Sequence, residues 1–257
     1  MSNPLVNELR ALALAVQFLT RVPVPAGTAY SPQSVAASVR YYPLVGALVG
    51  GICAGVFALA HMWFAGPLAV LLAVAAGLAV TGAFHEDGLA DTFDGVGAAA
   101  NDRDRALEIM RDSRLGTYGT VALIMALGIK VAALASLAPA TVCVALVAGH
   151  GLSRLSSVMV MQTGACVREA GAAAEVSKRL GTMGTLVVLL TGAALVAGLV
   201  AWLSASAAIL ALAGLTAGHG LMRLYFEPRL GGYTGDTLGA VQQASEIGLY
   251  LGLAAWA

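Results

Sequence analysis

Charged residues are scarce in this 257-residue chain, since Asp, Glu, Lys and Arg together make up 11% of it, against roughly a quarter in a soluble domain. That is too little charge to cover a water-exposed surface. The 14 basic and 14 acidic side chains also cancel, so nothing in the charge balance favours a nucleic-acid partner. The composition excludes an ordinary soluble protein and predicts that the lipid bilayer surrounds the chain.

Cysteine and aromatic residues are also few. Cys53, Cys143 and Cys166 stand far apart without a CxxC pair, which argues against a disulfide framework or a cysteine metal site. We expect them to be small buried hydrophobic residues. Aromatic residues reach only 6%, whereas there are 31 glycines. This balance is typical of membrane helices that pack closely through small residues.

Long apolar segments are what the sequence has in abundance. A spanning helix needs about 20 apolar residues, and the candidate segments are residues 42–64, 66–85, 118–137, 140–161, 183–203, 205–223 and 238–256. The last is the least typical, because Gln242, Gln243 and Glu246 lie in its first half. A partly buried helix is the alternative there.

The first thirty residues have leucines at helical spacing together with charges and prolines. This pattern predicts an amphipathic helix at the membrane interface or docked on the bundle. The predicted fold is therefore all-α: a polytopic integral membrane helix bundle of about seven spans plus an N-terminal amphipathic helix. Residues 1–257 are expected to form one domain.

The connections between these segments differ in charge. Those at residues 65–67, 137–139 and 204–206 are short and uncharged, whereas the others carry arginine or lysine. Positively charged connections face the cytoplasm in membrane proteins. The pattern predicts a cytoplasmic N-terminus and a C-terminus on the opposite side.

Acidic residues are concentrated in one place, because eight of the 14 lie within residues 86–112. Asp87, Asp91 and Asp94 stand at positions i, i+4 and i+7, which share one face if the segment is helical. Three carboxylates on one stripe repel one another unless cations neutralise them, and Mg²⁺ prefers oxygen ligands. An ordinary solvated acidic loop is the alternative. The predicted metal ligands are Glu86, Asp87, Asp91, Asp94 and Asp112.

Two glycine-rich turns follow the acidic segment. In the first, Arg111 and Arg114 precede a span whose free N-terminal amides suit phosphate binding, although arginines that merely anchor the span would look the same. In the second, residues 231–239, Asp236 is expected either to face the acidic cluster or to cap a helix. The substrate-binding candidates in these turns are Arg111 and Arg114, which would bind phosphate, Gly116, Thr117 and Gly119, which would shape the first turn, and Asp236.

Lys130, His150 and Arg154 lie inside predicted spans, where charge is costly and usually functional. We count them among the substrate-binding candidates. Interior hydrogen bonding, or extension of Arg154 to the interface, is the structural alternative. A different functional alternative is an ion-coupled transporter that uses these three residues with Glu246 as a relay.

Five sequence blocks resemble the cobalamin synthase family, also called adenosylcobinamide-GDP ribazoletransferases. They occur in the family's order and cover nearly the whole chain. Arg111 and Leu115 replace the lysine and isoleucine expected there. The blocks are Phe18–Pro25 (FLTRVPVP), Tyr42–Gly46 (YPLVG), Gly82–Gly95 (GAFHEDGLADTFDG), Glu108–Gly119 (EIMRDSRLGTYG) and Gly232–Ala240 (GYTGDTLGA).

The resemblance implies a multi-pass enzyme of the bacterial inner membrane with its active site on the cytoplasmic side. It would use Mg²⁺ to join two small molecules, a corrinoid nucleotide (adenosylcobinamide-GDP) and α-ribazole or its 5′-phosphate, releasing GMP. On this basis Asp94 or His85 is expected to be the catalytic base, and Arg21 joins the phosphate-binding candidates. A lipid phosphotransferase or an aspartate-rich prenyltransferase is the rival enzyme class, and a homo-oligomer is compatible with the sequence.

Overall fold

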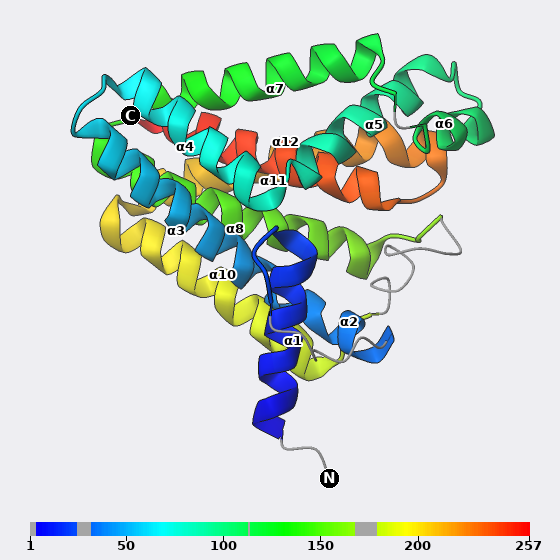
Figure 1. Cartoon of the computed structure of the whole chain (residues 1–257), viewed down its shortest axis with the longest axis horizontal. Helices are drawn as coiled ribbons and strands as arrows, with labels where there is room; N and C mark the ends of the chain where they lie inside the picture. The colour runs from blue at the N-terminus through cyan, green and yellow to red at the C-terminus, as the bar shows by residue number, and fades with distance from the viewer. Residues whose placement is uncertain (1–3, 25–31, 113, 168–178) are drawn as a thin grey trace.

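The computed structural model describes residues 4–24, 32–112, 114–167 and 179–257. Within these ranges the chain is a bundle of helices (Figure 1). The helices are α1 (Pro4–Leu19), α2 (Pro32–Ser38), α3 (Tyr42–His61), α4 (Gly66–Thr81), α5 (Phe84–Ala98), α6 (Arg103–Ile109), α7 (Thr117–Ala135), α8 (Pro139–Thr163), α10 (Thr182–Trp202), α11 (Ala205–Leu230) and α12 (Gly235–Trp256), with a 3₁₀ turn η1 (Val39–Tyr41) before α3.

The predicted N-terminal amphipathic helix is present as α1. Its C-terminal half buries Ala11, Leu14 and Ala15, whereas Leu5 and Leu9 nearer the N-terminus are exposed. In Figure 1, α1 extends away from the bundle at its N-terminal end. The helix is therefore docked by one half, and its other half presents leucines to the surroundings.

Small residues bring the main helices into close contact, as the glycine content predicts. At Gly50 of α3 an added Cβ would overlap the backbone of Leu146 and Val147 on α8. Gly214 of α11 and Gly248 of α12 each lie against the other's backbone in the same way. Neither helix pair could pack at these distances if larger side chains replaced the glycines.

The predicted span 66–85 does not continue through its last residues, because the helix breaks between α4 and α5. Gly82 and Ala83 both have left-handed backbone angles, with φ of 66° and 56°, and the two helix axes differ by 88°. A left-handed alanine is disfavoured because its Cβ crowds the following carbonyl. The break turns the acidic segment away from the direction of α4.

Among the described residues, five helices are long and apolar enough to cross a membrane, or up to six if α4 and α5 count as one bent span. They agree with the predicted segments at α3, α7, α8, α10 and α11. The predicted last span is a helix, α12, but it is not one of these five. The predicted count of seven spans therefore stays unconfirmed, while the helical membrane bundle itself is confirmed.

Helix α12 lies inside the bundle, where it packs against α5, α7, α8 and α11. It buries polar side chains, namely Thr237, Gln242, Gln243, Ser245 and Glu246. The alternative expected from its glutamines, a partly buried helix, agrees with this burial. Its burial places polar groups next to the start of α5.

Candidate functional site at the break between α4 and α5

A cleft of about 640 Å³ lies at the break between α4 and α5. Its charged lining residues are Arg21, Glu86 and Asp87. Phe18 and Phe84 supply aromatic walls, with their ring centroids 5.6 Å apart in an edge-to-face arrangement. The cleft thus combines carboxylates, a guanidinium group and apolar surface.

Arg21 is held at the cleft by the backbone and by the absence of a side chain at Gly82. Its N–H donates to the carbonyl of Val80 at 2.7 Å, and a Cβ at Gly82 would overlap its guanidinium group. Gly82 therefore permits the helix break and also leaves room for the guanidinium group of Arg21. The structure places this predicted phosphate-binding residue beside the first two predicted carboxylates.

The three aspartates of α5 lie in different surroundings although they share one helix. Asp87 is exposed in the cleft, Asp91 is half-buried and Asp94 is buried. No group of three or more Asp, Glu, His or Cys side chains in the described part of the chain is placed to hold a metal ion. The stripe therefore does not form a three-carboxylate metal site in this structure.

Asp94 binds the N-terminus of α7. One carboxylate oxygen accepts the N–H of Gly116 at 2.7 Å and the other accepts the N–H of Gly119 at 2.8 Å. A Cβ at either glycine would collide with this carboxylate. The first amides of a helix favour such an anion, so the protein's own Asp94 occupies the position that we expected a substrate phosphate to take.

Replacing Asp94 by alanine is therefore expected to lower the stability of the folded protein by about 1–3 kcal/mol, the usual cost of losing a buried helix cap. Thermal unfolding in detergent measures this. Asp104→Ala is the matched control, since the Asp104 side chain is 92% exposed. If Asp94→Ala melts like the wild type and loses activity, Asp94 has a chemical role instead.

Among the remaining candidate residues of the first glycine-rich turn, Arg114 is exposed and Asp112 is half-buried. Asp112 accepts hydrogen bonds from Arg114, at 2.9 Å from Nε, and these bonds hold the pKa of Asp112 below its usual value. Arg111 and Thr117 are exposed as well. None of these four residues is among the described lining of the cleft, so their predicted binding roles stay predictions.

The second glycine-rich turn meets α5, as expected. A Cβ at Gly88 would overlap the backbone of Asp236. Asp236 is not the helix cap, however, because the hydroxyl of Thr234 accepts the N–H of Thr237 and forms that cap. The alternative in which Asp236 caps the helix is wrong, and the turn fixes α12 against the acidic helix.

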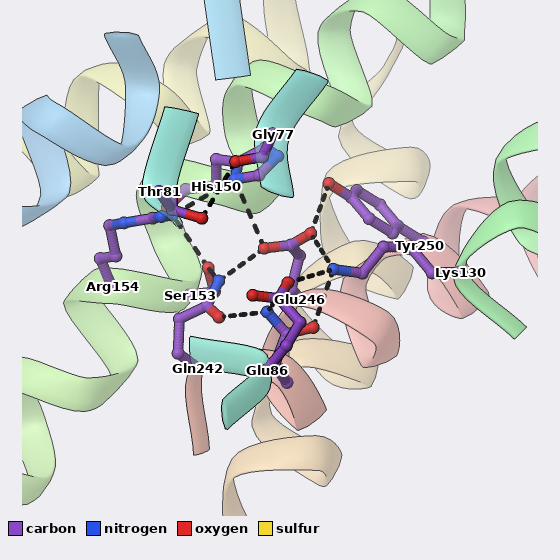
Figure 2. A network of polar contacts seen from close by, with 11 residues as sticks. Gly77, Thr81, Glu86, Lys130, His150, Ser153, Arg154, Gln242, Glu246 and Tyr250 are labelled. Atoms are coloured by element: carbon purple, nitrogen blue, oxygen red, sulfur yellow. Dashed lines mark hydrogen bonds and ion pairs between the residues drawn. The ribbon is translucent and has the colours of Figure 1, made fainter. Parts of the chain in front are cut away.

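A buried network of charged residues, drawn in Figure 2, adjoins the cleft through Glu86, which lines the cleft and belongs to the network. Lys130 Nζ is 2.9 Å from Glu246 Oε1 and 3.8 Å from Glu86 Oε1. The side chain of Glu246 is fully buried and that of Lys130 is 5% exposed. Charges this far from water are stable only when they are paired.

His150 and Arg154 complete this network on α8. His150 Nδ1 is 3.6 Å from Glu246 Oε2, and Arg154 donates to the backbone carbonyl of His150 at 2.9 Å. Glu86 and Glu246 thus balance Lys130 and Arg154 in charge. The structure brings all three predicted intramembrane residues together, but each has a protein partner, so direct contact with substrate stays a prediction.

The amide and hydroxyl groups that support the charged network could not be identified from the sequence. Gln242 donates to Glu246 Oε2 at 2.5 Å and to Ser153 Oγ at 2.8 Å, and Tyr250 donates to Glu246 Oε1 at 3.2 Å. Two adjacent glutamines one turn before a glutamate in an apolar helix were the available signal. His85, a predicted base, is buried on this inner side, where it lines a small cavity with Lys130 and Glu246.

The fold and the cleft together define a polytopic helical membrane protein with an acid-bearing site that can accommodate a charged ligand. Residues 11–254 match the family model for cobalamin-5-phosphate synthase. The chain belongs to this family, whose members are transferases of cobalamin synthesis. No solved structure matches it.

The curated relatives agree with the family model. An adenosylcobinamide-GDP ribazoletransferase of Leptothrix cholodnii is 44% identical over an alignment of 256 positions that covers 96% of each chain. Enzymes of the same name from Shewanella woodyi and Ralstonia pickettii are 40% and 39% identical, covering 95% and 99% of this chain and 95% and 98% of their own. The resemblance read from the sequence blocks is confirmed.

Proposed function

We propose that this chain joins adenosylcobinamide-GDP to α-ribazole, or to its 5′-phosphate, and releases GMP. The products are adenosylcobalamin or its 5′-phosphate. The observation that carries the proposal is the cleft at the helix break, where Arg21 shares a wall with Glu86 and Asp87. The relatives are named for adenosylcobinamide-GDP and ribazole as substrates, and the cleft has groups suited to binding a diphosphate.

The residues at the cleft fit a Mg²⁺ ion that the substrate helps to hold. Mg²⁺ usually binds one or two protein carboxylates and completes its shell with substrate phosphates and water. Glu86 lines the cleft, and its Oε2 atom is buried without a hydrogen-bond partner. Glu86 would therefore hold the ion, which when bound neutralises charge on the diphosphate and on the departing phosphate.

The reaction forms a bond between the ribazole hydroxyl oxygen and the corrinoid's phosphorus. The bond from that phosphorus to the GMP oxygen breaks, and GMP leaves with the electron pair. Arg21 binds and orients the diphosphate by charge-assisted hydrogen bonds. This positioning keeps the phosphorus in line for the attacking oxygen.

The hydroxyl proton must pass to a base inside the cleft. Asp94 uses both oxygens for the amides of α7, and His85 lies on the buried inner side. Asp87 is the exposed carboxylate of the cleft. We therefore assign the proton to Asp87, which the sequence pattern had suggested as a metal ligand, and leave Asp91 as a further ligand candidate.

We also propose that the cleft faces the cytoplasm of a bacterial inner membrane, with the N-terminus on that side. The uncharged connections after α3, α7 and α10 mark one end of the bundle, and the C-terminus lies at that end (Figure 1). Arginines are concentrated around α6, at the opposite end. This asymmetry favours a cytoplasmic site by the positive-inside rule.

Purified protein in detergent is expected to release GMP only when adenosylcobinamide-GDP, α-ribazole and Mg²⁺ are all present. Chromatography of both products measures this, with one corrinoid product formed for each GMP. Addition of EDTA should stop the reaction, and excess Mg²⁺ should restore it. GMP release without ribazole would indicate a hydrolase, and no reaction under any of these conditions would refute the proposed substrates.

A further inference from the structure

Gln243 connects the buried network to the cleft. Its side chain lies on α12 and is buried. Its amide nitrogen donates to Glu86 Oε1 at 2.8 Å and to Gln242 Oε1 at 2.7 Å. Its amide oxygen accepts from Lys130 Nζ at 2.8 Å. Both N–H donors of this amide and one of its two oxygen lone pairs are therefore used.

The orientation of this amide follows from the charges around it. If the amide were flipped, its oxygen would face the Glu86 carboxylate and its NH₂ group would face the Lys130 ammonium. Both contacts would be repulsive, because a carboxylate only accepts and an ammonium only donates. Lys130 is itself held by Glu246 at 2.9 Å, so the amide is anchored on an ion pair inside the bundle.

This anchoring has a specific effect on Glu86. Both Gln243 and Lys130 approach the same carboxylate oxygen, Oε1, at 2.8 and 3.8 Å. The other oxygen, Oε2, has no protein partner although it is buried. One oxygen is thus held by the network and the other remains for a ligand.

We infer that Gln243 is a positioning residue that holds Glu86 so that its second oxygen binds the metal–diphosphate ligand in the cleft. This inference rests on the proposed function. Partners of metal-binding carboxylates fix the orientation of the ligand, and their loss typically weakens metal binding about 10–100-fold. Gln243 would act through Glu86 without touching the substrate.

The test compares Gln243→Met with Tyr250→Phe in the full-length protein. Methionine keeps the length and volume of glutamine but removes all three hydrogen bonds. Tyr250→Phe removes one hydrogen bond from the same network at Glu246, away from Glu86. Mn²⁺ binding is measured by electron paramagnetic resonance with GDP as the diphosphate probe, and kcat is measured at varied Mg²⁺.

Gln243→Met is expected to weaken Mn²⁺ binding about 10–100-fold and to raise the Mg²⁺ requirement in parallel, while Tyr250→Phe stays close to the wild type. A folded Gln243→Met protein with wild-type Mn²⁺ affinity and kcat would overturn the inference. If the methionine variant does not fold, Gln243→Asn replaces it, since its shorter amide cannot reach both Lys130 and Glu86. Wild-type protein that neither binds Mn²⁺ nor releases GMP would refute the proposed function itself.

Discussion

Replacing Glu246 by leucine is expected to destabilise the folded protein by about 3–5 kcal/mol, the usual cost of removing one partner from a buried ion pair. Leucine has a similar size but no charge, so Lys130 loses its partner at 2.9 Å and His150 its neighbour at 3.6 Å. The hydrogen bonds from Gln242 and Tyr250 are lost at the same time. We expect Glu246→Leu to be among the most destabilising single substitutions in this chain.

Thermal unfolding in detergent and the yield of monodisperse protein measure this effect. The informative companion is the double variant Lys130→Met with Glu246→Leu, which removes both charges of the pair. Because an apolar pair leaves no uncompensated charge between these two positions, the double variant should recover part of the stability lost by Glu246→Leu. A Glu246→Leu protein as stable as the wild type would show that the pair contributes nothing to folding.

The sequence was sufficient to predict the membrane bundle, because membrane helices have a strong apolar signal that does not depend on tertiary contacts. The spans at α3, α7, α8, α10 and α11 follow from length and hydropathy alone. The break at Gly82 and Ala83 could not be predicted, because alanine has no preference for a left-handed conformation. Only packing against the rest of the bundle can impose it.

The candidate site was predicted in part. The charged residues predicted inside spans, Lys130, His150 and Arg154, lie together with Glu86 of the acidic segment, since each is costly in a membrane without a partner. Which partner each residue has is a matter of tertiary structure. Asp94 shows this most clearly, because its spacing from Asp87 and Asp91 says nothing of the amides of Gly116 and Gly119, to which it is bonded.

The same limit applies to the intramembrane charges. The sequence could not distinguish substrate-binding residues from a paired network, and the transporter alternative used the same four side chains. Their close pairing around Glu246 and the family membership favour a transferase whose buried charges support the cleft. Gln242 and Gln243, which join these charged residues by hydrogen bonds, could be recognised in the sequence only as a departure from an apolar span.

We propose that the phosphoryl group is transferred in the cleft at the helix break. Asp87→Asn is expected to lower kcat by roughly 10²–10⁴-fold, the usual contribution of a general base, because asparagine cannot accept the proton. The fold should be unaffected, since Asp87 is exposed and lies on the surface of the cleft. Mn²⁺ affinity should remain near the wild-type value, because Glu86 holds the ion.

The most direct measurement is therefore the rate of GMP release by Asp87→Asn, with Asp104→Asn as the control from the same acidic segment. The side chain of Asp104 is 92% exposed and lies on α6, outside the cleft. We expect Asp87→Asn to be folded and to bind the metal but to be nearly inactive, and Asp104→Asn to be fully active. An Asp87→Asn protein that releases GMP at the wild-type rate would contradict this expectation and would place the reaction elsewhere in the molecule.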